Sequence, residues 1–183
     1  MISTSARDSL DRMVSLGLQN ALPAPPGATV QVEPVDSLVP PAGAYMVVLM
    51  LASHTFRLVI AMYLPRDRAT RDYLEQVGRL TPGDESEQAL RDSVCESANM
   101  CCGTVNREIG RFYQQTGMST PHIIDSRSAG YVQGLAHQHL RHFRVELGGT
   151  RVLATLCADA RREMDFDWWP EAQPEVAGEL EFF

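Results

Sequence analysis

A stretch of the chain from Asp92 to Gly103, DSVCESANMCCG, gathers acids, an amide, three cysteines and a glycine in a segment with a helical hydrophobic pattern. At about 100° per residue, one stripe of this helix, about 80° wide, contains Asp92, Glu96, Asn99, Gly103 and Asn106. The apolar side chains of the same segment cluster on roughly the opposite side. The pattern therefore predicts a buried apolar face and an outward stripe of acids, amides and glycine.

The composition of this stripe is unusual for a solvated helix surface. Such surfaces are usually built from Glu, Lys, Arg and Gln, whereas Asn and Gly are each unfavourable in a helix by up to about 1 kcal/mol relative to alanine. Glycine lets another backbone approach closely, and an amide one turn from a carboxylate can contact the same visitor. The stripe is thus a candidate contact surface, with an ordinary solvated helix face as the simpler alternative.

The cysteines of this stretch could bind a metal, form a disulfide or pack in the core. On a helix, Cys95 and Cys102 would lie about 10 Å apart along the axis, which is beyond disulfide reach. Cys101 falls on the apolar side, and no pair has the C-x-x-C spacing of zinc sites. His137 and His139 would share one face of a predicted strand, but no third ligand lies at strand or hairpin spacing. We therefore expect no metal site.

The stripe needs a rigid helix, and the hydrophobic pattern predicts one of roughly nine turns over residues 85–117. Shorter helices are predicted over 6–22 and 66–78. Strands are predicted over 28–34, 44–53, 54–65, 121–127, 136–147 and 150–158, of which the second and third form a hairpin. This order of elements predicts a fold of the α/β (α+β layered) class.

The length of 183 residues and the hydrophobic content of 44% suit one well-buried core. We predict a single domain over residues 1–158 and an acidic C-terminal tail over 159–183. This tail holds eight acids against two arginines, in a chain whose formal net charge is −7. It also contains Trp168, Trp169, Phe182 and Phe183, which could dock in a partner groove or fold back on the domain.

Composition argues against several classes of function. The chain contains arginine but no lysine, which excludes a Schiff-base lysine and a Walker-type phosphate loop. No basic patch is visible, so we expect no nucleic-acid partner. No apolar run approaches the roughly 20 residues that span a bilayer, and acids interrupt the N-terminal segment where a signal peptide would be apolar. We therefore expect a soluble, cytoplasmic protein without membrane insertion.

The spacing D-x-x-x-E-x-x-N of Asp92, Glu96 and Asn99, followed by Met100 and Gly103, resembles the signature helix of the CheC, CheX and FliY phosphatases of bacterial chemotaxis. That family acts on phosphorylated CheY-type response regulators. The preceding hairpin and helix, the next strand and the closing pair of strands are similar to a CheX layout. CheC-type members usually carry two copies of the motif, and the single copy here is closer to CheX. The resemblance implies an antiparallel-rich sheet packed against two helices.

The resemblance also implies roles for the stripe residues. Asn99 would orient the attacking water and Glu96 would pair with the regulator's active-site lysine, although a general base is a competing role for Glu96. Asp92, Gly103 and Asn106 would contact the partner. No cofactor of the chain's own is implied, because Mg²⁺ is expected on the partner response regulator. The family further suggests a homodimer formed by sheet extension.

Two functions remain open at this level. The first is a phosphatase that dephosphorylates an aspartyl-phosphorylated CheY-type response regulator. The alternative is a non-catalytic CheX-like module that binds a receiver domain or another signalling partner. Binding of the phosphorylated regulator without faster dephosphorylation would favour the second function over the first.

Overall fold

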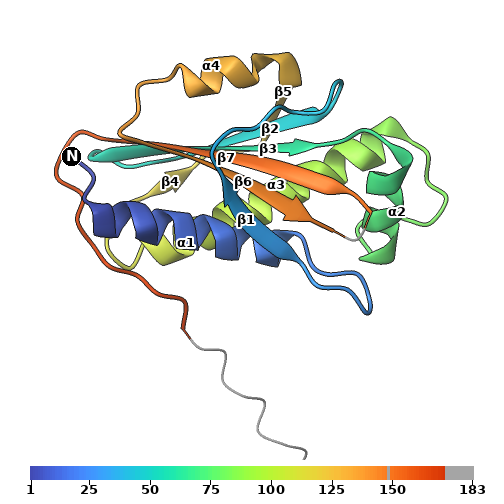
Figure 1. Ribbon diagram of the computed structural model, residues 1–183, viewed down its shortest axis with the longest axis horizontal. Coiled ribbons are helices and arrows are strands. Elements are labelled where there is room, and N and C mark those ends of the chain that lie inside the picture. Colours follow the sequence, from blue (N-terminus) through green and yellow to red (C-terminus); the bar gives the residue numbers. More distant parts are fainter. Residues whose placement is uncertain (148, 172–183) are drawn as a thin grey trace, which may run out of the picture.

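A single seven-stranded sheet organises the computed structural model, which describes residues 1–147 and 149–171 (Figure 1). Along the chain the elements are α1 (Thr4–Ala21), β1 (Gln31–Val35), β2 (Tyr45–Ala52), β3 (Phe56–Leu64), α2 (Arg68–Gln76), α3 (Glu87–Ile109), β4 (Gly117–Met118), β5 (His122–Asp125), the 3₁₀ turn η1 (Ser126–Ser128), α4 (Ala129–Gln133), β6 (His139–Glu146) and β7 (Arg151–Ala160). All strand pairs of the sheet are antiparallel. The predicted class and the β2–β3 hairpin are therefore confirmed.

The two long helices form where a capping residue precedes a helical hydrophobic period. Ser3 caps α1 and Ser86 caps α3, each by accepting a hydrogen bond from the backbone N–H three residues further on. Both helices bury one face completely, with Leu10 and Leu18 of α1 and Val94 of α3 fully inaccessible. This burial, rather than propensity alone, is what stabilises a helix in a folded chain.

Some local predictions are corrected by the structure. α3 ends at Ile109 rather than at Gly117, because the chain leaves the helix at Gly110, a weak helix former, and continues as turns. The strand β4 and the helical segment formed by η1 and α4 were not predicted. They have two, three and five residues, which is too short for a hydrophobic period to be visible.

The sheet interleaves two halves of the chain. Its order is β1-β6-β7-β3-β2-β4, with β5 also paired to β2. The first half supplies α1, β1 and the β2–β3 hairpin, and the second supplies α3, β5 and the β6–β7 hairpin. Each half's single strand pairs with the other half's hairpin, and the hairpins meet where β3 pairs with β7. Neither half can therefore complete its sheet alone.

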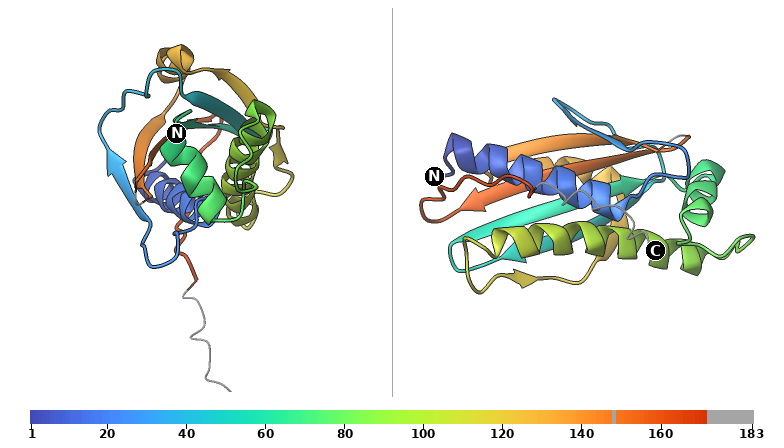
Figure 2. Two further views of the ribbon diagram at one scale, coloured as in Figure 1. Left: turned by 90° about the vertical axis from the view of Figure 1, so that its right-hand side faces the viewer. Right: turned by 90° about the horizontal axis from the view of Figure 1, so that it is seen from below.

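The helices cover the sheet unequally. α1 and α3 lie side by side on one face, α4 lies over the other, and α2 stands at one end (Figure 2). The main hydrophobic core fills the space between α1, α3 and the sheet, and a smaller cluster lies under α4. The expected packing of the sheet against two helices is thus confirmed, with α4 as an addition.

The segment after β7 folds back on the domain as far as it is described. Met164 forms a parallel bridge with Ile2, while Phe166 and Trp168 are 8% and 4% exposed. Of the two alternatives for Trp168, the structure therefore shows the second. The expected boundary at residue 158 falls inside β7, and Phe182 and Phe183 lie outside the described residues.

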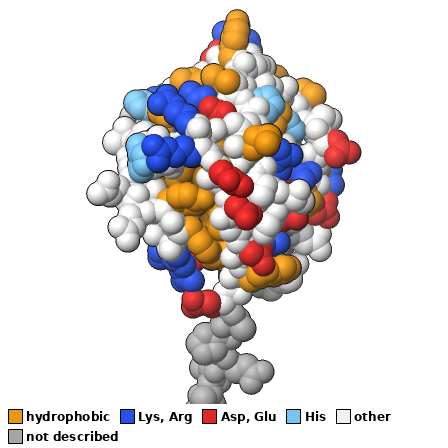
Figure 3. All heavy atoms as spheres, turned by 90° about the vertical axis from the view of Figure 1, so that its left-hand side faces the viewer, with side chains coloured by type: hydrophobic (Ala, Val, Ile, Leu, Met, Phe, Trp, Pro, Cys, Tyr) orange, Lys and Arg blue, Asp and Glu red, His pale blue; other side chains and the backbone are white. Residues whose placement is uncertain are grey.

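Side chains of different types are mixed on the surface at one end of the molecule (Figure 3). On the end of the molecule that carries the amino-terminus, acidic, basic and hydrophobic side chains are interspersed rather than separated into large patches (Figure 3).

Within residues 1–147 and 149–171, none of the helices combines the length and the apolar character needed to cross a bilayer.

Candidate functional site

The predicted polar stripe lies on the outer side of α3. Asp92 and Glu96 are exposed, and Asn99, Gly103 and Asn106 are half-buried. The residues on the opposite side, including Val94 and Ala98, are buried against α1 and the sheet. The helical-wheel prediction of a buried face and an outward polar stripe is therefore confirmed.

Glu96 and Asn99 are the polar stripe residues whose side chains have no polar partner in the described part of the chain. Neither side chain forms a hydrogen bond or an ion pair with any residue in the described part of the chain. Asp92 is less available, because its carboxylate accepts a hydrogen bond of 2.7 Å from the Gln88 amide one turn earlier. A carboxylate and an amide, spaced one turn apart, are thus both presented to solvent by a helix.

The last two stripe residues have different surroundings. A Cβ atom added at Gly103 would meet nothing within 4 Å, so this glycine leaves open space beside Asn99 rather than a packing contact. The Asn106 amide oxygen accepts a hydrogen bond of 2.8 Å from the Thr116 hydroxyl. Asn106 therefore ties the segment after α3 to the helix, a structural role that the sequence alone did not indicate.

Contacts on the flank of the stripe hold α3 in place. The loop after α2 is bonded to the helix at Arg79, whose guanidinium donates to the Ser97 hydroxyl at 2.8 Å and whose carbonyl accepts from Ser93 at 2.6 Å. Near the C-terminal end, the Trp168 indole N–H donates to the buried Glu108 carboxylate at 3.2 Å. The helix that carries the stripe is therefore held in its middle and near its C-terminal end, as well as along its buried face.

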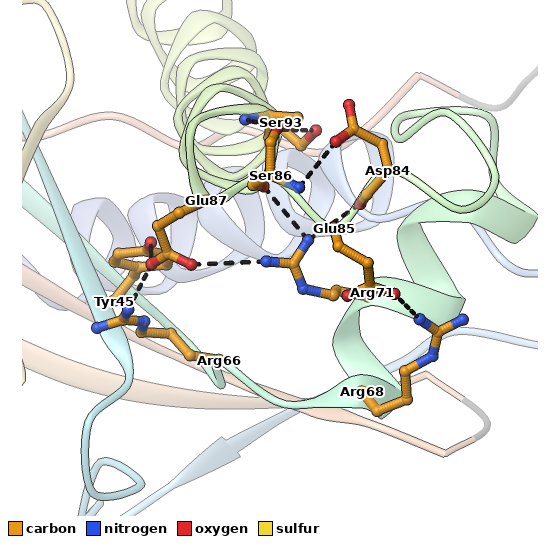
Figure 4. Close-up of polar contacts among 10 residues, drawn as sticks. Tyr45, Arg66, Arg68, Arg71, Asp84, Glu85, Ser86, Glu87 and Ser93 are labelled. Carbon is orange, nitrogen blue, oxygen red and sulfur yellow. Dashed lines mark hydrogen bonds and ion pairs between the residues drawn. The ribbon is translucent and has the colours of Figure 1, made fainter.

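A polar network anchors the N-terminal end of α3 (Figure 4). The Glu87 carboxylate in the first turn accepts hydrogen bonds from the Tyr45 hydroxyl and from the guanidinium groups of Arg66 and Arg71. The Tyr45 hydroxyl, with the two arginines, lowers the pKa of Glu87 below its usual value, so this carboxylate stays ionised. These residues come from β2, the loop between β3 and α2, α2 and α3, and no local sequence pattern could have brought them together.

The cysteines are packed as predicted. Cys101 and Cys102 are fully buried, Cys95 is half-buried, and all four cysteines are free thiols. Burial raises the pKa of Cys101, and it raises the pKa of Cys102 to about 12. Both thiols therefore stay protonated at neutral pH, where they act as small apolar side chains.

The predicted histidine pair is corrected. His137 lies before β6 rather than on it, with Nδ1 against the Leu135 carbonyl, while His139 at the start of β6 contacts the Asp11 carboxylate at 2.6 Å. The two rings therefore have separate partners. Among residues 1–147 and 149–171, no three His, Cys, Asp or Glu side chains gather into an arrangement able to hold a metal ion.

Comparison with solved structures relates this fold to chemotaxis proteins. CheX from Vibrio vulnificus gives a TM-score of 0.60 at 14% sequence identity, covering 82% of this chain and 99% of that one. A chain of the CheX–CheY–BeF3–Mg²⁺ complex from Borrelia burgdorferi gives 0.60 at 11%, covering 82% and 96%. A CheC-like superfamily protein from Shewanella sp. PV-4 gives 0.58 at 11%, covering 86% and 99%. No protein-family model and no curated protein sequence matches the chain.

The chain therefore has a CheX/CheC-like fold along most of its length. At such low identity the likeness concerns the backbone arrangement. Similarity of the backbone does not determine the roles of Glu96 and Asn99, which depend on the local geometry and chemistry of α3.

Proposed function

We propose that this protein is a phosphatase for an aspartyl-phosphorylated CheY-type response regulator, with α3 as its active surface. The observation that carries the proposal is the pair Glu96 and Asn99, one helical turn apart and without partners in the described part of the chain. The CheX/CheC-like fold supports it, since one structure of similar fold contains CheX together with CheY.

The chemistry asked of the protein is modest. Water attacks phosphorus in line with the leaving carboxylate, so that a new P–O bond forms, the acyl phosphate bond breaks, and aspartate and inorganic phosphate are released. The Asn99 amide can accept a hydrogen bond from this water through its oxygen and donate to a phosphoryl oxygen through its nitrogen. Glu96 pairs with the regulator's lysine and holds the two active surfaces in register. The regulator's own Mg²⁺ and lysine stabilise the negative charge on the phosphoryl group.

Rigidity is what allows a single amide to contribute. An orienting group must fix the position of the attacking water to within a small fraction of the diameter of a water molecule. Groups on packed helices are positioned more precisely than groups on loops. α3 meets this requirement through its buried face, its capped start and the hydrogen bonds at Arg79 and Glu108. The open space at Gly103 lets a partner backbone approach Asn99.

The test is phosphate release from a phosphorylated CheY-type regulator of the same organism, with native protein and with Asn99→Ala. We expect native protein to accelerate release and Asn99→Ala to lose roughly 100-fold or more of this acceleration, as for other lost transition-state hydrogen bonds. Asn20→Ala is the control, because Asn20 is also a helical asparagine but is exposed on α1, away from the polar stripe. It should retain full activity.

Binding without acceleration would overturn the catalytic part of the proposal. In that case α3 would be a docking surface, and the protein would be a non-catalytic receiver-binding module. Equal loss of activity in Asn99→Ala and Asn20→Ala would also contradict the assignment, because it would indicate a general effect on the fold.

A further inference from the structure

A hollow of about 270 Å³ opens beside the N-terminal half of α3, next to the polar stripe. It lies between the start of β2, the end of β5 and the helix. Its lining includes Tyr45, Arg66, Arg91, Ile123, Ile124 and Asp125. The hollow thus combines aromatic and aliphatic walls with two guanidinium groups.

Both arginines lie near the Tyr45 ring, but they differ in their other contacts. The Arg66 guanidinium lies 4.8 Å from the ring centroid and is paired with Glu87. The Arg91 guanidinium lies 5.8 Å from the same centroid and forms no hydrogen bond or ion pair with any residue of the described chain. Arg91 is therefore the lining cation whose charge is not yet compensated.

The acids near the hollow already have partners. Asp125 is bonded to Arg127 through both carboxylate oxygens, at 3.1 and 2.7 Å, and these bonds lower its pKa to about 2. Glu87 is held by Tyr45, Arg66 and Arg71. Neither acid can turn to Arg91 without giving up these contacts. Arg91 is therefore left to pair with an anion from outside the chain.

We propose that this hollow receives a carboxylate side chain from the surface of the partner regulator, with Arg91 as its main contact. A planar carboxylate suits a guanidinium, because the two can form paired hydrogen bonds. The Tyr45 ring and Ile123 beside the pair would shield one side of it from water, which strengthens it. The inference rests on the proposed function and adds a specificity element to it.

The position of Arg91 suits a partner seated on the polar stripe. At about 1.5 Å per residue, Arg91 lies about 7 Å from Glu96 and about 12 Å from Asn99 along the helix axis. A typical interface covers about 800 Å² on each partner, which is wide enough to include both the stripe and the hollow. The selected regulator would be one with an acidic side chain about 10 Å from its phosphorylation site.

The test measures the dissociation constant for the regulator with BeF3⁻ and Mg²⁺ in place of the phosphoryl group, which native protein cannot hydrolyse, with native protein, Arg91→Ala and Arg91→Glu. We expect Arg91→Ala to raise the constant about tenfold, as for a lost charge-assisted hydrogen bond, and Arg91→Glu to raise it further. Arg7→Ala is the matched control, because Arg7 is an exposed arginine near the start of α1. The N-terminal end of α1 lies at the end of the molecule away from α2 (Figure 1). It should change the constant less than twofold.

A charge exchange tests the contact itself. Each exposed acid of the regulator near its phosphorylation site is changed to arginine, and one such variant should restore binding to Arg91→Glu while weakening binding to native protein. If native protein binds the regulator and the dissociation constant of Arg91→Ala is within twofold of the native value, the role of Arg91 is contradicted. The proposed function is then unaffected. If native protein neither binds nor accelerates dephosphorylation, both fall together.

Discussion

At the scale of single residues, the site relies on the difference between an amide and a carboxylate. Asn99 is neutral at every accessible pH and offers both a donor and an acceptor, so it can hold a water without titrating. Glu96 brings a charge, which suits pairing with a lysine better than proton abstraction. The Glu96 side chain is exposed, so a lysine of the partner can reach it.

Glu96→Gln separates these two roles, because it keeps the size of the side chain and removes the charge. If Glu96 pairs with the regulator's lysine, we expect KM for the phosphorylated regulator to rise about tenfold while kcat falls less than tenfold. Steady-state phosphate release over a range of regulator concentrations measures both. A loss of kcat of about 100-fold or more, with KM unchanged, would instead indicate a general base. Glu163→Gln, an exposed acid after β7, is the control.

The site could be predicted from sequence only where its residues share one helix. Helical periodicity placed Glu96, Asn99 and Gly103 on one outward stripe, and the structure agrees. The hollow could not be predicted in this way, because Tyr45, Arg66 and Arg91 meet through the tertiary fold.

At the scale of elements, the position of the stripe depends on how closely α1 approaches α3. The two helices cross at Gly17, where an added Cβ atom would lie 2.8 Å from the Cys101 carbonyl oxygen and 3.1 Å from its Sγ. A backbone oxygen cannot move without shifting its helix. Gly17 is therefore required by packing, whereas Gly103 on the outer side of α3 has no neighbour within 4 Å.

Gly17→Ala and Gly103→Ala should consequently have opposite effects on the free energy of unfolding. We expect Gly17→Ala to lower it by about 1–3 kcal/mol through overpacking. Gly103→Ala should raise it by up to about 1 kcal/mol, because alanine favours the helix and meets no obstacle. Urea unfolding followed by circular dichroism measures both. If Gly103→Ala also weakens regulator binding despite its greater stability, the glycine serves the partner; unchanged binding would show that the regulator does not approach there.

Elements were predictable in proportion to their length and regularity. The α1 and α3 segments and the β2–β3 hairpin carry long hydrophobic periods. α1 and the hairpin were found near their expected bounds, and α3 near its expected start. The end of α3 was misplaced because the apolar residues beyond Gly110, such as Phe112 and Tyr113, continue the period after the helix has stopped. Those rings instead pack on Phe166, a contact with the segment after β7 that no local pattern reveals.

At the scale of the whole molecule, the two ends of the sheet differ. β1 forms one end, where Pro34 lacks an N–H group and Glu33 is paired with Arg144 at 2.7 Å. Proline and charged residues on an edge strand oppose further strand pairing. A homodimer formed by sheet extension stays a prediction, and these features favour the opposite end, formed by β4 and β5, for such a contact.

The buried thiols between α1, α3 and the sheet should make the whole fold sensitive to alkaline pH. In the unfolded chain a cysteine loses its proton near its ordinary pKa of 9.0, whereas burial raises the pKa of Cys101 and raises that of Cys102 to about 12. Above pH 9 the unfolded state therefore binds fewer protons than the folded state, and the free energy of unfolding falls as pH rises. Below pH 9 both states keep these protons, so the thiols add no pH dependence there.

Between pH 8 and pH 10, we expect the two thiols together to lower the free energy of unfolding by about 3 kcal/mol. The double variant Cys101→Ala/Cys102→Ala should lose that part of the pH dependence. Its cavities lower the stability at both pH values, so they cancel in the difference. Urea unfolding in a reducing buffer gives this difference for native protein, the double variant and Cys95→Ala, whose half-buried thiol should matter less. An equal pH dependence in native protein and the double variant would mean that these thiols ionise in the folded state, and hence that the contact between α1 and α3 opens to water at high pH.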